Sequence, residues 1–162
     1  MVCIRSVNID DLEQLYKIEQ RCFPQAEAAS KEVLLQRLER FSSHFFLLEE
    51  QGRPVGMVNG MVTHSSVITD SMYDNACLHQ EEGEWQTVFG LDVLPQYRCR
   101  GYGGQLMQHL VTHAKEQGRK GCILTCKQGL IPYYQRLGYQ QEGVSQSIHG
   151  GAVWYDMRLI FP

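Results

Sequence analysis

Apolar and polar residues follow two different periods along the 162-residue chain, and these periods predict helices and strands. Apolar residues three and four positions apart predict helices over about 10–21, 30–41, 103–117 and 130–137. Runs that are apolar throughout, or that alternate residue by residue, predict strands over 2–7, 45–49, 55–63, 88–93, 121–126, 139–148 and 152–160. This order of elements predicts a single α/β domain, of the α+β type, over residues 1–162.

Cap and turn residues mark where several of these elements begin and end. Asp10 and Glu13 have the spacing of a capping box at the start of the first helix. The run from His149 to Gly151 lies between the last two predicted strands and indicates a hairpin turn. Residues 64–83 are long for a plain connection, so we predict a partly helical flap there, around 70–77.

Composition and charge narrow the class of protein. Apolar residues make up 43% of the chain, charged residues 20%, and the formal net charge is −3, which does not favour binding to nucleic acid or to an anionic membrane. There is no apolar run long enough for a membrane span, and the N-terminal residues have no apolar core of a signal peptide. We therefore expect a cytoplasmic protein whose six cysteines are reduced thiols.

The stretch from Leu91 to Gly104, LDVLPQYRCRGYGG, has the pattern of an anion-binding site. A predicted strand leads through a glycine-rich turn into a predicted helix, so unpaired backbone N–H groups and a positive helix end come together. The glycines allow a ligand to approach the backbone closely, and Arg98 and Arg100 add positive charge. The stretch predicts a site for a phosphate or pyrophosphate group.

A metal site is not indicated. His109 and His113 lie four residues apart on a predicted helix, which is a spacing found in zinc sites. The glutamate of the H-E-x-x-H motif is absent, because Leu110 follows His109, and no third ligand is evident. We interpret the two histidines as part of a packed or solvated helix face.

Two motifs resemble those of the GNAT N-acetyltransferases. The run from Arg98 to Gly103 resembles the Q/R-x-x-G-x-G/A acyl-CoA motif of that family, and Val93 and Pro95 form a typical lead-in. The run from Leu130 to Tyr139 is similar to the family's A-x-x-F-Y-x-x-x-G-F stretch. The resemblance implies a GNAT fold, with a mixed and mostly antiparallel central sheet that is splayed at the cofactor site. Within the family, the pattern is nearest to the arylalkylamine N-acetyltransferases.

The resemblance also implies acetyl-CoA as the acetyl donor and assigns roles along the chain. It implies that the backbone of Leu91 faces the thioester carbonyl, that Val93 bonds the pantetheine, and that Tyr134 bonds the departing sulfur. Gly90, within an apolar strand, supports a bulge or a close backbone approach there. The predicted cofactor-binding residues are Leu91, Asp92, Val93, Arg98, Cys99, Arg100, Gly101, Tyr102, Gly103, Gly104 and Tyr134. The predicted acceptor-binding residues are Phe23, Pro24, Thr87 and Phe89.

The sequence does not identify the group that takes a proton from the acceptor amine. The arylalkylamine enzymes carry two histidines on the central strand, and the matching positions here are Thr87 and Phe89, neither of which can act as a base. Glu84 at the strand start, Asp92 within the strand and His79 in the flap are the candidates. If Asp92 is buried, its pKa rises toward a useful range.

We therefore expect an acetyltransferase that moves an acetyl group directly from acetyl-CoA to a primary amine through a tetrahedral intermediate. The expected acceptor is a small molecule, and the protein is expected to be a monomer or a homodimer. Two alternatives remain: acetylation of a peptide or protein amine, and a non-catalytic module that binds or senses acyl-CoA. The Tyr134 match favours catalysis, whereas the missing histidines favour the sensor.

Overall fold

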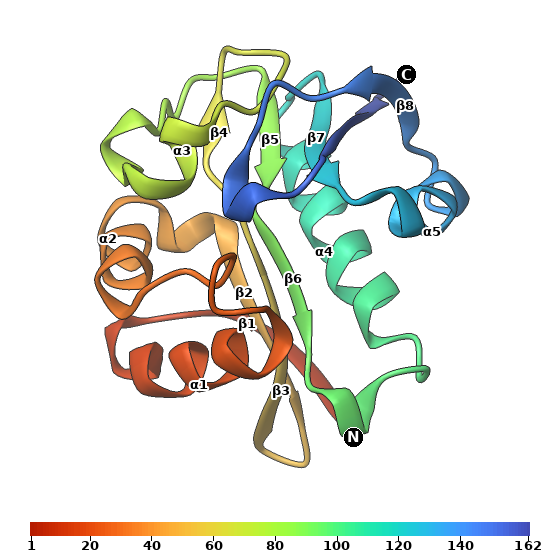
Figure 1. Cartoon of the computed structure of the whole chain (residues 1–162). Helices are drawn as coiled ribbons and strands as arrows, with labels where there is room; N and C mark the ends of the chain where they lie inside the picture. The colour runs from red at the N-terminus through yellow and green to blue at the C-terminus, as the bar shows by residue number, and fades with distance from the viewer.

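The structure, a computed structural model, describes residues 1–162 as nine strands and five α-helices joined by short 3-10 turns (Figure 1). The strands are β1 (Val2–Ser6), β2 (Phe45–Glu50), β3 (Arg53–Asn59), β4 (Val62–Thr63), β5 (Trp85–Val88), β6 (Gly90–Val93), β7 (Gly121–Cys126), β8 (Gln140–Val144) and β9 (Tyr155–Ile160). The helices are α1 (Leu12–Cys22), α2 (Lys31–Phe41), α3 (Asp70–Asp74), α4 (Tyr102–Glu116) and α5 (Ile131–Arg136). None of the helices is long and apolar enough to cross a membrane.

The strands form two half-sheets that separate at the middle of the molecule. One has the order β1-β2-β3-β6 and the other the order β4-β5-β7-β9-β8. Every pairing is antiparallel except that of β5 with β7. No residue of β6 pairs with β7, so the edge of β6 that faces away from β3 has no strand partner. The predicted fold class, a mixed and mostly antiparallel sheet splayed at its centre, is confirmed.

Close backbone contact fixes the point where the half-sheets separate. β3 gives way to β4 at Gly60 and Met61, and β5 gives way to β6 at Phe89. A Cβ atom on Gly60 would lie 1.9 Å from the carbonyl oxygen of Thr87, so only glycine fits at this crossing. β5 and β6 belong to different half-sheets, and so do β3 and β4. The predicted strands 88–93 and 55–63 are therefore each divided in two.

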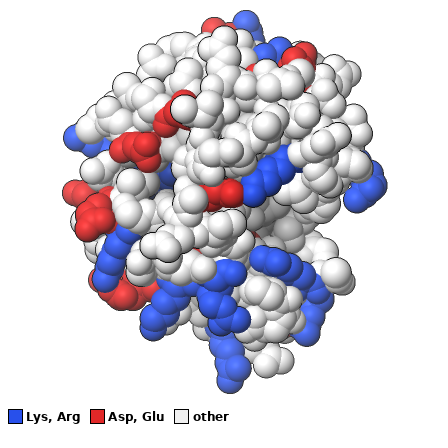
Figure 2. All heavy atoms as spheres, in the orientation of Figure 1, with Lys and Arg blue, Asp and Glu red and all other residues white.

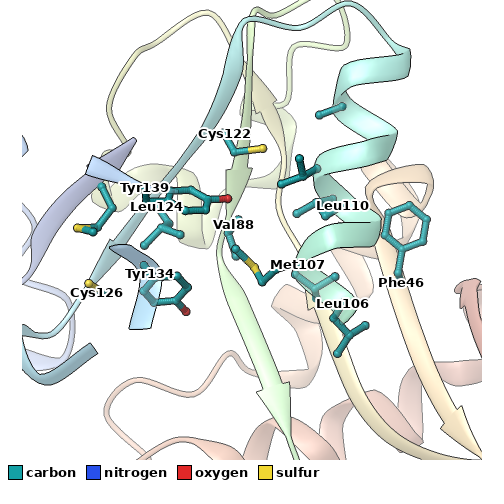
Figure 3. Close-up of a cluster of buried hydrophobic side chains, with 14 of the residues drawn as sticks. Phe46, Val88, Leu106, Met107, Leu110, Cys122, Leu124, Cys126, Tyr134 and Tyr139 are labelled. Atoms are coloured by element: carbon teal, nitrogen blue, oxygen red, sulfur yellow. The ribbon is translucent and has the colours of Figure 1, made fainter. Parts of the chain in front are cut away.

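Helices cover both faces of the sheet, as Figure 1 shows with α1 and α2 on one side and α4 on the other. The largest apolar cluster lies between α4 and the strands of both half-sheets, and it includes Leu106 and Leu110 of α4 (Figure 3). Cys122 and Cys126 are buried in the same cluster, and all six cysteines are free. A second cluster lies between α1, α2 and the strands β2 and β3.

Two turn predictions are wrong in detail. The capping box is formed by Asn8 and Asp11 ahead of α1, not by Asp10 and Glu13, because a 3-10 turn precedes the helix. β8 ends at Val144 and β9 begins at Tyr155, so residues 145–154 form a broad loop instead of a tight hairpin turn. The partly helical flap is present as α3 and a following 3-10 turn over Ala76–Leu78. That residues 1–162 form a single domain stays a prediction.

Candidate active site

A cavity of about 450 Å³ opens where the half-sheets separate. Its walls come from five parts of the chain: α1 and α2 with the loop between them, the flap helix α3, the junction of β5 and β6, the end of β7 with α5, and the loop between β8 and β9. Most of the lining is apolar, and its rings are Phe23, Tyr73, Phe89, Tyr134, His149 and Trp154. Such a shape suits a small organic ligand held by apolar contacts and a few polar groups.

The glycine-rich loop lies at the N-terminus of α4. Cys99 and Gly101 have φ angles of +64° and +81°, so the loop turns sharply before the helix begins at Tyr102. No side chain caps the helix, which leaves the first backbone N–H groups available to an anion. A Cβ on Gly103 would lie 2.8 Å from the Tyr133 hydroxyl oxygen, whereas one on Gly104 would have no neighbour within 4 Å.

The two arginines of the loop are held by contacts within the chain. Arg98 Nε donates to the carbonyl oxygen of Val93 over 2.8 Å. Arg100 Nη1 lies 3.4 Å from Glu50 Oε1, and its guanidinium lies over the ring of Tyr97. In Figure 2, Lys and Arg side chains gather at the lower end of the face shown, where Figure 1 has β3 and the loop from β6 toward α4. Positive charge at this end favours an anionic ligand.

The unpaired edge of β6 and the side chain of Tyr134 border the same cavity. Leu91 of β6, in one half-sheet, lines the cavity, and so does Tyr134 of helix α5, which follows β7 of the other half-sheet. Burial raises the pKa of Tyr134 well above the ordinary value, so its hydroxyl keeps its proton at neutral pH. The edge therefore offers backbone donors and acceptors, and the tyrosine offers one O–H donor.

A group of buried polar side chains lies next to Gly90, on the side of β6 that faces α1. Asp92 is completely buried, and its carboxyl group and that of Glu19 both lie beside Gly90. Burial, and then the neighbouring Glu19, raise the pKa of Asp92 well above its usual range. Arg37, also buried, donates to Asn59 Oδ1 over 3.0 Å. The cavity is thus bordered by a charged cluster that is shielded from water.

A family model for the acetyltransferase (GNAT) family matches residues 12–139, most of the chain. The chain belongs to this family. The prediction made from the two motifs is thus confirmed. A serotonin N-acetyltransferase of Mesocricetus auratus is 26% identical over 95 residues, which are 58% of this chain and 44% of that protein. The arylalkylamine pattern is therefore only a weak indication.

A second curated relative is also described as an N-acetyltransferase. An uncharacterised N-acetyltransferase of Methanocaldococcus jannaschii is 28% identical over 151 residues, covering 87% of this chain and 62% of that protein. The chain spans less than two thirds of the length of these curated relatives.

Solved structures show the same fold at low identity. The loading GNATL domain of CurA from Lyngbya majuscula has a TM-score of 0.86 at 15% identity, covering 99% of this chain and 98% of that one. The PaiA N-acetyltransferase of Thermoplasma acidophilum, solved in complex with coenzyme A, has a TM-score of 0.74 at 17% identity over 99% of both chains.

Not all of the acceptor and base residues predicted for this GNAT protein lie at the cavity. Phe23 and Phe89 line it. Pro24 is exposed outside it, and Thr87 is buried with its hydroxyl donating to the Met61 carbonyl oxygen. Glu84 lies at the far end of β5, away from this cavity, where it pairs with Lys120 in a separate polar hollow.

Several residues of the cavity were missed by sequence reasoning, among them the charged residues Glu19 and Arg37. Both lie on the buried faces of their helices: Glu19 follows the buried Ile18, and Arg37 precedes the buried Leu38. A charged residue on an apolar helix face is the signal that could have identified them, because such residues are rarely buried without a partner.

His79, the third candidate base, belongs to a cluster away from the cavity. His44 Nε2 and His79 Nε2 lie 3.0 Å and 2.9 Å from Glu81 Oε1, an arrangement that resembles a metal-ligand set. However, the Val62 N–H donates to His79 Nδ1 over 3.0 Å, so a neutral His79 carries its proton on Nε2. That nitrogen donates to Glu81 and has no lone pair for a metal. The cluster is therefore a set of hydrogen bonds that joins Glu81 to His44 and His79, which we call the Glu81 tie.

Glu81 anchors the flap through this tie. Arg119 Nη2 also donates to Glu81, over 3.0 Å. Burial would raise the pKa of Glu81, but its bonds with His44 and His79 outweigh burial and lower the pKa to about 2. Burial also lowers the pKa of His44, so that ring is neutral at pH 7.

We expect Glu81→Gln to lower the thermal midpoint of unfolding at pH 7.5 by about 2–4 °C, because Glu81 is half-exposed and its tie contributes about 1 kcal/mol. Its lowered pKa means that this stability is present above the ordinary value of 4.5 and is lost as the pH falls toward about 2. Melting curves should therefore show the wild-type advantage shrinking from pH 5 to pH 3. Glu82→Gln, at an exposed neighbour, is the control. Equal thermal midpoints of unfolding for wild type and Glu81→Gln at pH 7.5 would contradict a stabilising role for the hydrogen bonds of Glu81.

Proposed function

We propose that this protein transfers an acetyl group from acetyl-CoA to a primary amine of a small molecule. The observation that carries the proposal is the cavity at the splayed strands, whose lining residue Leu91 lies next to Gly103 at the uncapped N-terminus of α4. Family membership supports acetyl-CoA as the donor. The other partner is a small amine, for the reasons that follow.

The proposed path of acetyl-CoA follows the gap between β6 and β7. Its pyrophosphate lies on the N–H groups at the start of α4, where the helix end is positive. Its pantetheine arm bonds the free edge of β6 at Leu91 and Val93. This path brings the thioester into the cavity, with its carbonyl near the Leu91 backbone and its sulfur near Tyr134. The N–H stabilises the oxyanion, and the tyrosine hydroxyl stabilises the departing thiolate.

A small acceptor is supported by loops that close the cavity. His149 Nε2 lies 3.0 Å from the carbonyl oxygen of Glu27, and Lys127 pairs with the Glu27 carboxylate over 2.6 Å. On another side, the backbone N–H of Ile148 donates to Asp70 over 3.0 Å. The bonds of His149 and Ile148 link the loop between β8 and β9 to the loop after α1 and to the flap, and Lys127 links the end of β7 to the loop after α1. An extended peptide needs an open groove at this place, and these links close it.

The lining indicates an amine with an apolar body. Aromatic rings supply large contact surfaces, and a cation can also interact with their faces. The carboxyl groups of Glu19 and Asp74 border the cavity and attract a positive charge. With part of the 450 Å³ occupied by the thioester, the remaining space suits an aromatic or branched alkylamine.

A panel of amines tests the proposal. Purified protein with acetyl-CoA should release free thiol in the presence of small amines with apolar bodies, and mass spectrometry should detect the N-acetyl product. Peptides with a free N-terminus or a lysine serve as the comparison, and we expect no turnover with them. Turnover with peptides alone would support the peptide enzyme instead. Tight CoA binding by calorimetry, without turnover of any amine, would support the acyl-CoA sensor.

A further inference from the structure

Glu19 and Asp92 form a carboxyl pair whose remaining oxygens have no partner. Glu19 Oε2 accepts the backbone N–H of Ala29 over 2.9 Å, but Glu19 Oε1 is buried without a hydrogen bond. Both carboxyl oxygens of Asp92 are buried, and no N–H donor of the chain reaches them. A buried carboxylate without donors is costly, and burial accordingly raises the pKa of Asp92.

The space beside Gly90 connects this pair to the cavity. A Cβ on Gly90 would lie 3.1 Å from Asp92 Oδ1 and 3.8 Å from Glu19 Oε1. It would also lie 3.6 Å from Asn59 Nδ2, a buried donor with no partner. Gly90 and Glu19 both line the cavity. The polar atoms of the pair therefore lie directly behind the wall of the cavity.

The charges around the pair suit uptake of a proton from a cation. Arg37 is the buried positive charge beside the two carboxyl groups. The other titratable or charged groups that face them or Arg37 are Cys22 of α1 and Tyr73 and Asp74 of α3, and Arg98 faces Cys22. When an ammonium ion enters, two negative carboxylates balance two positive charges, the ammonium and Arg37. The positive charge of the ammonium ion favours the ionised form of Asp92 and so opposes the burial that raises its pKa.

We propose that Glu19, paired with Asp92, is the group that takes the proton from the acceptor's ammonium ion. This inference rests on the proposed function. The N–H bond of the ammonium breaks, and its proton moves to Glu19 Oε1. The freed lone pair forms the N–C bond at the thioester carbon, and the C–S bond breaks to give the amide and the CoA thiolate. The second proton on nitrogen goes to the thiolate, and the pair later releases its proton to water.

Glu19→Gln tests this role with little change in shape. The glutamine oxygen can still accept the Ala29 N–H, and its amide N–H can donate to Asp92, so the fold should be kept. We expect kcat/KM for the amine to fall about 100-fold, the usual contribution of a proton-transfer group. The affinity for CoA should stay within about twofold. Asp92→Asn is the second variant, with the same expected direction. Glu13→Gln, on the exposed face of α1, is the control.

The pH profile separates a proton acceptor from a merely structural pair. In the wild type, kcat/KM should rise with pH through one apparent pKa, which belongs to the pair and not to one residue. This step should disappear or move in both variants and stay in Glu13→Gln. An unchanged profile and rate in Glu19→Gln would overturn the role of Glu19 and leave the proposed function standing. Absence of turnover in the wild type with every amine would overturn both.

Discussion

Replacing Gly103 by glutamate should weaken CoA binding at least 100-fold. A Cβ at this position points toward the Tyr133 hydroxyl, 2.8 Å away, and toward Leu91 Cδ2, 3.7 Å away. Gly103 thus faces the space between α4, α5 and β6 through which the cofactor would pass. A glutamate there fills the space and sets a carboxylate against the pyrophosphate. Losing two charge-assisted hydrogen bonds, each about 1.5–3 kcal/mol, accounts for the size of the effect.

Titration calorimetry with CoA measures this change, and circular dichroism verifies the fold. An acidic residue in the first turn of a helix is favourable for the helix, so α4 should remain intact. Gln108→Glu is the matched control: it adds the same charge at an exposed position of α4, about one turn further from the N-terminus of the helix. We expect a clearly smaller loss for the control. An unchanged dissociation constant for Gly103→Glu would show that CoA takes another path.

Replacing Tyr134 by phenylalanine should lower kcat about 10-fold to 100-fold and leave KM for acetyl-CoA nearly unchanged. Transfer of a proton from tyrosine to a thiolate is uphill by about 2 kcal/mol at ordinary pKa values, about 10 and 8.5. Burial raises the pKa of Tyr134 further, so the hydroxyl stabilises the thiolate by a hydrogen bond instead of protonating it fully. Loss of a hydrogen bond to a charged group costs about 1.5–3 kcal/mol.

Steady-state kinetics with a reactive amine measure this effect, and Tyr133→Phe is the control. Tyr133 is adjacent in α5, but its hydroxyl points toward Gly103 and it does not line the cavity. Because Tyr134 keeps its proton through neutral pH, the ratio of wild-type to variant kcat should be constant from pH 6 to pH 8. Equal kcat values for the wild type and Tyr134→Phe would remove this residue from the reaction.

The sequence predicted those parts of the molecule whose causes are local. Helical periodicity placed α4 and α5 within a residue or so of their observed bounds. The glycine-rich loop was also found, because backbone angles and helix ends are local properties. The divided strands were not predicted, since the run from Val88 to Val93 is apolar on both sides of Phe89. The residues of a strand do not by themselves determine which other strand it pairs with.

The buried carboxyl pair shows why the acceptor side was harder to predict. Glu19 and Asp92 lie in α1 and β6, far apart in the sequence, and their chemistry depends on the contact between these elements. Asp92 was a candidate because it lies in an apolar run, whereas Glu19 reads as one more polar residue of an amphipathic helix. The glycines of the last loop were recognised as turn residues, and Gly150 and Gly151 do have positive φ angles. Their loop closes the cavity instead of joining two strands tightly.

The separation of the two half-sheets has a consequence for how this scaffold can be altered. In the proposed function, donor recognition depends on a helix end and a strand edge, both part of the framework of helices and strands. The cavity proposed for the acceptor is bordered in large part by three surface connections: the one after α1, the flap and the loop between β8 and β9. Surface connections tolerate insertions and substitutions far better than framework elements do. Exchanging these three segments should therefore redirect the protein toward new acceptors while its use of the donor is retained.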